Sequence, residues 1–317
     1  MKTVFLNSSK VNFDGNLDYS PLSKASTLAN FHSSSPEEIL ERVKDHDIVI
    51  TKEIPLGGDL IRNFPPCVKL ICEAGTGYNN IDLVACKEKG ITVCNIPGYS
   101  TDSVAQLAIT LLLSLSSYLT QQQNMIQNNN FNNFTKHLQV PHFELNGKTL
   151  GIIGAGTIGQ GVIKVARALG MNILTYNRTP KLWDDPRVKS VSLDDLLAGS
   201  DLVSLHCPLT PQTKHLIDIT KLKLMKPSAY LINTSRGALI NETDLITALQ
   251  ENIIAGAGLD VLDPEPPTLD NPLFYMDNVI LTPHIGWQTL EARQRLINLL
   301  GENIKAFING TPMNVVK

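Results

Sequence analysis

Three charged or titratable side chains follow apolar segments in the second half of the chain: Arg236, Glu265 and His284. Those segments have the composition of strands in a parallel sheet, whose carboxyl ends face a ligand crevice. A histidine can donate a proton to a carbonyl oxygen near neutral pH, a neighbouring carboxylate holds its ring, and a guanidinium grips a carboxylate. Together the three suit hydride transfer to a 2-oxo acid, although each alone could be a core histidine, a loop carboxylate or a surface ion pair.

A glycine motif, Gly154 to Gly159 (GAGTIG), lies between an apolar segment at 150–153 and a helical pattern at 162–170. The order strand, glycine turn and helix is the context that a dinucleotide-binding loop requires. Its glycines would provide a backbone angle that other residues avoid, close approach to a pyrophosphate and tight packing of helix on strand. The free N–H groups of the helix N-terminus would bind the phosphates. The sequence therefore predicts a nicotinamide dinucleotide cofactor.

The next predicted strand ends at Asn177-Arg178-Thr179, where the adenosine ribose of the cofactor is expected. NAD sites usually carry a carboxylate there, which accepts hydrogen bonds from the ribose hydroxyls and repels a 2′-phosphate. Neutral, cationic and hydroxyl side chains together suit a phosphate. NADP(H) is therefore the preferred cofactor, while NAD(H) stays open because Arg178 could simply point to solvent.

Short apolar runs alternate with helical patterns along the chain, which is typical of parallel sheets covered by helices. We expect strands at 4–6, 48–50, 68–72, 91–93, 150–153, 173–176, 202–205, 229–233, 257–261 and 279–281. We expect helices at 36–43, 81–88, 104–119 and 290–307, and helix start signals occur at Ser192 and Asn241. A segment rich in Gln and Asn, 121–133, is interpreted as an exposed connecting arm.

The chain has 317 residues, with 27 basic and 30 acidic side chains and a net charge of −3. Its length suggests two domains. Its charge does not indicate binding to nucleic acid or anionic lipid. The five cysteines form no CxxC pair and no cluster with metal-ligand spacing, so we expect neither a metal site nor a disulfide framework. We expect a cytoplasmic protein with no membrane partner, because no apolar run has the form of a signal peptide or approaches the length of a membrane span.

Several motifs in this order resemble those of the D-isomer-specific 2-hydroxyacid dehydrogenases. Besides the glycine motif they are Gly75-Thr76-Gly77-Tyr78-Asn79-Asn80-Ile81-Asp82, Asn95-Ile96-Pro97, Asn233-Thr234-Ser235-Arg236-Gly237, Gly258-Leu259-Asp260-Val261 with Glu265, and Thr282-Pro283-His284-Ile285-Gly286. The resemblance spans essentially the whole chain. It implies an α/β protein of two Rossmann-like domains with parallel sheets, in which a dinucleotide-binding domain (100–285) is inserted into a discontinuous substrate domain (1–99 plus 286–317).

The resemblance also implies residue roles. His284 would be the acid/base, Glu265 its partner and Arg236 the substrate-orienting residue, while the backbone amides around Thr76 and Gly77 would hold the substrate carboxylate. Cofactor contacts would come from Gly154, Gly156, Gly159, Thr157 and Ile158 at the pyrophosphate, Asn177, Arg178 and Thr179 at the ribose, Cys207 and Thr234 along the cofactor, and Asp260 near the carboxamide. Lys52 could line the substrate pocket or face solvent.

Trp287, directly after His284-Ile285-Gly286, resembles the glycerate dehydrogenase or hydroxypyruvate (glyoxylate) reductase branch, although it could simply pack where the last helix begins. That branch implies an oxidoreductase that transfers a hydride between NAD(P)H and hydroxypyruvate or glyoxylate, with Trp287 at the substrate. Two alternatives stay open: a dehydrogenase of another D-2-hydroxy acid such as D-lactate, or a non-catalytic, nucleotide-sensing module similar to a corepressor. We also expect a homodimer through the apolar helix at 104–119, although a buried helix has the same pattern.

Overall fold

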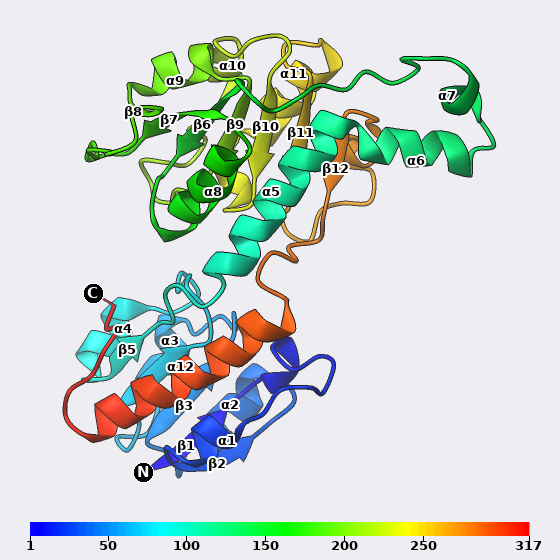
Figure 1. Ribbon diagram of the computed structural model, residues 1–317. Helices are drawn as coiled ribbons and strands as arrows, with labels where there is room; N and C mark the ends of the chain where they lie inside the picture. The colour runs from blue at the N-terminus through cyan, green and yellow to red at the C-terminus, as the bar shows by residue number, and fades with distance from the viewer. Residues whose placement is uncertain (317) are drawn as a thin grey trace. The chain divides into compact units, whose positions relative to one another are not determined.

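The structure is a computed structural model that describes residues 1–316, and Lys317 lies outside the described part of the chain. The chain forms two compact units, one of Met1–Ser100 with Trp287–Lys317 and the other of Thr101–Gly286. Each unit is built on a parallel sheet covered by helices (Figure 1). The α/β fold class with two parallel sheets is therefore confirmed. The assignment of one unit to the substrate and the other to the cofactor stays a prediction.

The first unit has a five-stranded parallel sheet in the order β2-β1-β3-β4-β5. The strands are β1 (Lys2–Phe5), β2 (Thr27–Asn30), β3 (Ile48–Thr51), β4 (Leu70–Glu73) and β5 (Thr92–Cys94). The helices are α1 (Ser20–Ser23), α2 (Pro36–Arg42), α3 (Gly58–Arg62), α4 (Leu83–Glu88), α12 (Leu290–Ile308) and a 3-10 turn at Ser8–Lys10. Because successive strand residues point to opposite faces, Val4 packs with α2, α3 and α4, whereas Phe5 packs with α1 and α12.

The second unit has a seven-stranded parallel sheet in the order β12-β11-β10-β9-β6-β7-β8. The strands are β6 (Thr149–Ile153), β7 (Asn172–Tyr176), β8 (Val188–Ser190), β9 (Leu202–Leu205), β10 (Tyr230–Asn233), β11 (Gly256–Leu259) and β12 (Val279–Leu281). One face packs on α5 (Thr101–Ser117) and α8 (Thr157–Ala168), and the other on α9 (Leu193–Gly199), α10 (Ile219–Leu222) and α11 (Glu242–Gln250). Two 3-10 turns lie at Gly237–Leu239 and Pro272–Tyr275. The strand order reverses on either side of β6, and ligands of open α/β sheets bind at such a switch point.

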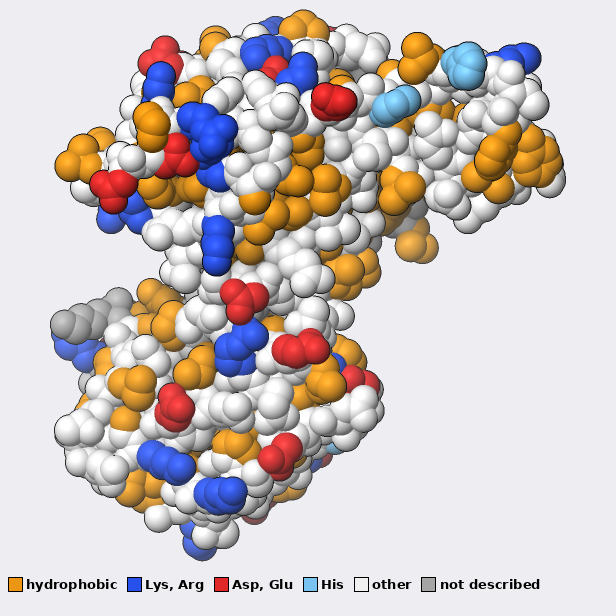
Figure 2. Space-filling view, viewed as in Figure 1, with side chains coloured by type: hydrophobic (Ala, Val, Ile, Leu, Met, Phe, Trp, Pro, Cys, Tyr) orange, Lys and Arg blue, Asp and Glu red, His pale blue; other side chains and the backbone are white. Residues whose placement is uncertain are grey.

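The Gln- and Asn-rich segment is an exposed arm, as expected, but it is largely helical. It contains α6 (Leu119–Gln127) and α7 (Asn132–Thr135), which extend away from the sheet of their unit (Figure 1). Hydrophobic side chains gather at the end of this arm (Figure 2), where Phe131 and Phe134 are 53% and 73% exposed. The composition of the segment hid these helices because Gln and Asn carry no apolar stripe.

The long helix α5 is buried within its own unit. Its apolar side chains, among them Ala108 and Leu112, join the cluster formed with α8 and the sheet. This packing accounts for the apolar pattern at 104–119 in the way that the buried-helix alternative expected, and the homodimer stays a prediction. No single helix within residues 1–316 is long and apolar enough to cross a membrane; α5 and α6 reach that length only together, and they bend by 63° at their junction.

Candidate active site

The glycine loop follows β6, and two of its glycines have no room for a side chain. Gly154 has a φ of +95°, and a Cβ there would lie 2.6 Å from the backbone nitrogen of Cys207. A Cβ at Gly159 would lie 2.4 Å from the carbonyl oxygen of Gly154, so this glycine permits the close packing of α8 on the loop. Gly156, the N-cap of α8, has nothing within 4 Å of such a Cβ. The loop therefore leaves open space in front of the helix N-terminus, which suits a phosphate.

Unsatisfied polar groups surround the carboxyl ends of these strands. The side-chain atoms Asn177 Nδ2, Thr234 Oγ1 and His206 Nδ1 are buried and have no hydrogen-bond partner among residues 1–316. Leaving such a group unpaired costs about 1–3 kcal/mol, so these atoms fit a polar ligand such as a dinucleotide. Burial lowers the pKa of His206 to about 4 and raises the pKa of the Cys207 thiol to about 11, so both side chains are uncharged at neutral pH.

The residues after β7 contact the first turn of the glycine loop. Asn177 Oδ1 accepts a hydrogen bond from the Ala155 backbone nitrogen at 2.7 Å. Arg178 and Thr179 are exposed. Lys181 Nζ donates to the Ala155 carbonyl oxygen at 2.6 Å, which places a second cation beside the predicted ribose site. The sequence reasoning missed Lys181, although its position just after Arg178-Thr179-Pro180 was a usable signal.

His284 and Glu265 form a pair at the carboxyl edge of the second sheet. His284 follows β12 and Glu265 follows β11, and the distance from Nδ1 to Oε2 is 2.8 Å. The Leu262 backbone nitrogen donates to the other carboxylate oxygen at 3.0 Å. Partial burial alone would raise the pKa of Glu265, but the hydrogen bond and charge of His284 lower it overall. The pair therefore holds an ionised carboxylate against the imidazole ring.

Asp260 fixes the loop that carries His284. Its Oδ1 accepts from Thr282 Oγ1 at 2.6 Å and from the Ile285 nitrogen at 2.8 Å, and its Oδ2 accepts from the Gly286 nitrogen at 2.9 Å. Its backbone oxygen accepts from the His284 nitrogen at 2.8 Å, which supports the positive φ of 53° at His284. Burial raises the pKa of Asp260 despite these hydrogen bonds. The sequence reasoning placed Asp260 at the cofactor and missed this anchoring of the histidine loop.

Arg236 follows β10, next to the strand that precedes Glu265. Its side chain is exposed, Nη1 donates to the Ser235 carbonyl oxygen at 2.7 Å, and Asn233 Nδ2 donates to the Arg236 carbonyl oxygen at 2.8 Å. The adjacent Gly237 touches the loop of Glu265, because a Cβ there would lie 1.9 Å from the Leu262 carbonyl oxygen. The structure thus brings the predicted trio to the ends of three adjacent strands, β10, β11 and β12.

A second group of predicted residues lies within the first unit. Lys52 is only 4% exposed, and its Nζ lies 4.5 Å from the centroid of the Trp287 ring, so the solvent-facing alternative is wrong. Thr76 Oγ1 donates to the Ile96 carbonyl oxygen at 3.0 Å, and the Ile96 nitrogen donates to Gly75. These bonds hold the loop that contains Thr76 and Gly77 against the segment after β5.

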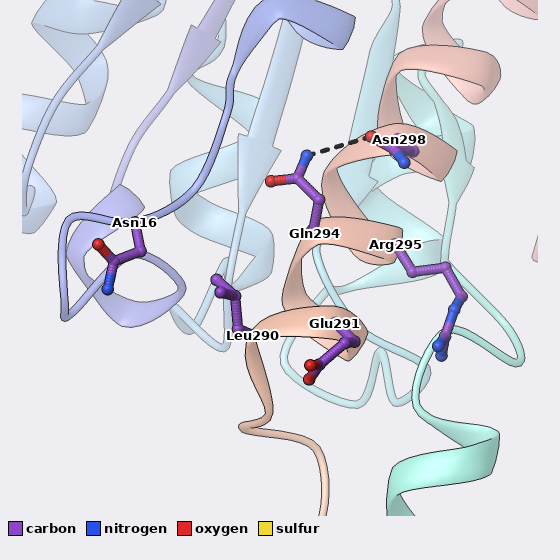
Figure 3. A pocket seen from close by; sticks show the side chains of 6 residues that line it. All are labelled: Asn16, Leu290, Glu291, Gln294, Arg295 and Asn298. Carbon is purple, nitrogen blue, oxygen red and sulfur yellow. Dashed lines mark hydrogen bonds between the residues drawn. The ribbon is translucent and has the colours of Figure 1, made fainter.

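One surface hollow of the first unit lies elsewhere. It has a volume of about 390 Å³, lies along the start of α12 and is lined by Asn16, Leu290, Glu291, Gln294, Arg295 and Asn298 (Figure 3). None of these is a predicted site residue, and the hollow is shallow and open to solvent, so we give it no catalytic role. Across residues 1–316, the structure contains no group of His, Cys, Asp and Glu side chains arranged to hold a metal ion.

Comparisons with known proteins agree on one family. The sequence model described as "D-isomer specific 2-hydroxyacid dehydrogenase, NAD binding domain" matches residues 109–286. Hydroxypyruvate reductase of Blautia hydrogenotrophica is 38% identical, and the match covers 100% of this chain and 99% of that protein. Glyoxylate reductase of Thermococcus litoralis is 41% identical, and the match covers 88% of this chain and 86% of that protein. A solved acyclic imino acid reductase in complex with NADPH and D-Arg superposes with a TM-score of 0.86 at 31% identity, covering 100% of both chains.

Proposed function

The chain belongs to the D-isomer-specific 2-hydroxyacid dehydrogenases and is therefore a nicotinamide-dependent oxidoreductase. From this premise we propose that it reduces hydroxypyruvate or glyoxylate with NADPH. The observation that carries the proposal is the 2.8 Å pairing of His284 with Glu265, one strand away from Arg236. The relatives named hydroxypyruvate reductase and glyoxylate reductase support this choice of substrate.

In this proposal each member of the trio has one task. A reduced nicotinamide held by the second unit would be the source of the hydride for C2 of the substrate. His284 gives a proton from Nε2 to the developing alkoxide, since Nδ1 is engaged with Glu265. The Glu265 carboxylate stabilises the imidazolium before the proton leaves. Arg236 binds the substrate carboxylate and polarises the carbonyl.

The cofactor would be held by the second unit. The open space at Gly156 and the amides of Thr157 and Ile158 would take the pyrophosphate, and the unpaired atoms of Asn177 and Thr234 would gain partners. No carboxylate occupies positions 177–181, directly after β7, to repel a 2′-phosphate, and Arg178 and Lys181 supply positive charge nearby. These features support a preference for NADPH, with NADH accepted more weakly.

The substrate would also use the first unit. The amides at Thr76 and Gly77 would hold the carboxylate, as the family resemblance implies, and Lys52 with Trp287 would add a fixed cation and an apolar wall. We propose these roles in addition to those of Arg236, Glu265 and His284.

A substrate panel tests the proposal. Hydroxypyruvate, glyoxylate, pyruvate and a branched 2-oxo acid are each reduced with NADPH and with NADH, and kcat/KM is compared. We expect the highest values for hydroxypyruvate or glyoxylate with NADPH, and we expect Asn177→Asp to shift preference toward NADH. A higher value for pyruvate would favour the D-lactate alternative, and no turnover despite bound NADPH would favour the non-catalytic one.

The homodimer and the cytoplasmic location stay predictions. One side of α5 is buried in its own unit, so a dimer would use its exposed side or another apolar surface. The exposed phenylalanines at the end of the arm, Phe131 and Phe134, provide one.

A further inference from the structure

A buried pair of opposite charges in the first unit is not used by the reaction proposed above. Glu73, the last residue of β4, is completely buried, and Lys52, just after β3, is 4% exposed. The two strands are neighbours, with Thr51 paired to Glu73. Both charged groups converge on Gly75, where a Cβ would lie 3.2 Å from Lys52 Nζ and 3.4 Å from Glu73 Oε1. The cluster therefore lies at the base of the loop Gly75–Gly77.

Glu73 is held by neutral donors. Asn80 Nδ2 donates to Oε2 at 2.9 Å, and the Glu53 backbone nitrogen donates to Oε1 at 3.0 Å. Within residues 1–316, no cation lies close enough to form a salt bridge with it; Lys52 pairs with the Glu53 carboxylate instead. Burial raises the pKa of Glu73 to about 7, although the Asn80 hydrogen bond and the Lys52 charge oppose the rise. The carboxyl therefore changes charge near neutral pH.

Asn7 holds the backbone of Lys52 at the end of β3. Asn7 Oδ1 accepts from the Lys52 backbone nitrogen at 2.9 Å, and Asn7 Nδ2 donates to its carbonyl oxygen at 2.6 Å. The ammonium group lies over the Trp287 ring, which attracts cations at its face. A fixed, buried cation acts on a nearby anion more strongly than an exposed lysine would.

The loop above the cluster is the one to which we assign the substrate carboxylate. The Ala74 nitrogen donates to the Thr51 carbonyl oxygen at 2.7 Å, so the start of the loop is tied to the strand end that carries Lys52. An anion bound at this loop is attracted by Lys52, and it is repelled by Glu73 only when Glu73 is ionised. Proton binding and anion binding are therefore linked at this place.

We propose that Glu73 is a positioning residue that couples substrate binding to a proton: neutral Glu73 leaves the Lys52 charge to the substrate carboxylate, and ionised Glu73 competes for it. This inference rests on the proposed role of the loop Gly75–Gly77. The titratable groups that face Glu73 are Lys52, Glu53 and the adjacent buried thiol of Cys72. Substrate affinity is then highest below neutral pH and falls as the pH rises through about 7.

Glu73→Gln tests the proposal, with KM for hydroxypyruvate measured from pH 6 to pH 8.5. We expect the wild-type KM to rise on the order of fivefold to tenfold over this range, and the variant KM to stay low, while kcat follows the same pH profile in both. Glu41→Gln, which removes an exposed carboxylate of the same unit outside this cluster, is the matched control and keeps the wild-type rise. Asn80→Ala removes a hydrogen bond to the ionised form, so it moves the rise to higher pH. Parallel KM profiles for wild type and Glu73→Gln would overturn the proposal.

Thermal unfolding gives a second readout that needs no turnover. A buried acid whose pKa is raised in the folded state destabilises the fold as the pH rises from its ordinary value of 4.5 toward about 7. The Tm of Glu73→Gln minus the wild-type Tm should therefore increase between pH 5 and pH 7.5. Oxamate should raise the wild-type Tm more at pH 6 than at pH 8. If the difference in Tm between wild type and Glu73→Gln does not change with pH, the inference is refuted. If that difference changes as expected but the enzyme turns over no 2-oxo acid, only the proposed function is refuted.

Discussion

Replacing Gly237 by alanine should displace the loop that carries Glu265. A Cβ at this position would lie 1.9 Å from the Leu262 carbonyl oxygen and 2.1 Å from its carbonyl carbon. Real Cβ atoms stay beyond 3.0 Å from such atoms, so the separation must grow from 1.9 to 3.0 Å, a change of at least 1.1 Å between the two loops. Leu262 donates its backbone N–H to Glu265, which holds His284, so the shift reaches the proton donor.

A misplacement of about 1 Å at reacting groups can cost about 10²-fold in rate, or about 2.7 kcal/mol. We therefore expect kcat/KM of Gly237→Ala for hydroxypyruvate to fall about 100-fold. The overpacking should also destabilise the second unit by about 1–3 kcal/mol, which lowers Tm by several degrees. NADPH binding, measured by fluorescence titration, should change little because the glycine loop lies after a different strand.

Gly57→Ala is the control for this experiment. Gly57 has an ordinary φ of −71° and nothing within 4 Å of an added Cβ, so this variant should keep the wild-type kcat/KM and Tm. If Gly237→Ala keeps kcat/KM within about twofold of wild type and has an unchanged Tm, the close contact between Gly237 and Leu262 does not position the loop of Glu265.

Two further substitutions test the supports of His284. Glu265→Gln should lower kcat/KM by about 10- to 100-fold, because a charged hydrogen bond to His284 is lost; an unchanged kcat/KM would argue against the pair. Because the pKa of Glu265 is lowered, its stabilising effect is present above its ordinary value of 4.5 and is lost in acid, so the Tm difference between wild type and Glu265→Gln should shrink as the pH falls below 4.5. Asp260→Asn cannot accept at both side-chain positions and should reduce kcat by about 10-fold or more, which a wild-type kcat would contradict.

Features encoded locally could be predicted from the sequence. The Ser192 hydroxyl accepts from the Asp195 nitrogen at the start of α9, and the Asn241 side chain accepts from the Asp244 nitrogen at the start of α11, as the start signals indicated. The glycine loop likewise has the strand before it and the helix after it that its motif requires. The site trio was found because strand ends in a parallel sheet share one edge.

Features that depend on distant contacts were missed. The edge strands β2 and β8 are short and partly polar, and only pairing with a neighbouring strand defines them. Lys181 reaches the glycine loop across 26 residues, and Asp260 holds a loop 25 or 26 residues later. The burial of Glu73 has no local signature, because a carboxylate at a strand end is usually exposed.

The central claim is that His284 donates the proton while the hydride reduces a 2-oxo acid. The most direct test compares wild type and His284→Gln in NADPH-dependent reduction of hydroxypyruvate, with the NADPH dissociation constant measured in both. We predict that the variant loses about 10²- to 10⁴-fold in kcat and binds NADPH with unchanged affinity. Near-normal turnover by His284→Gln would contradict the account.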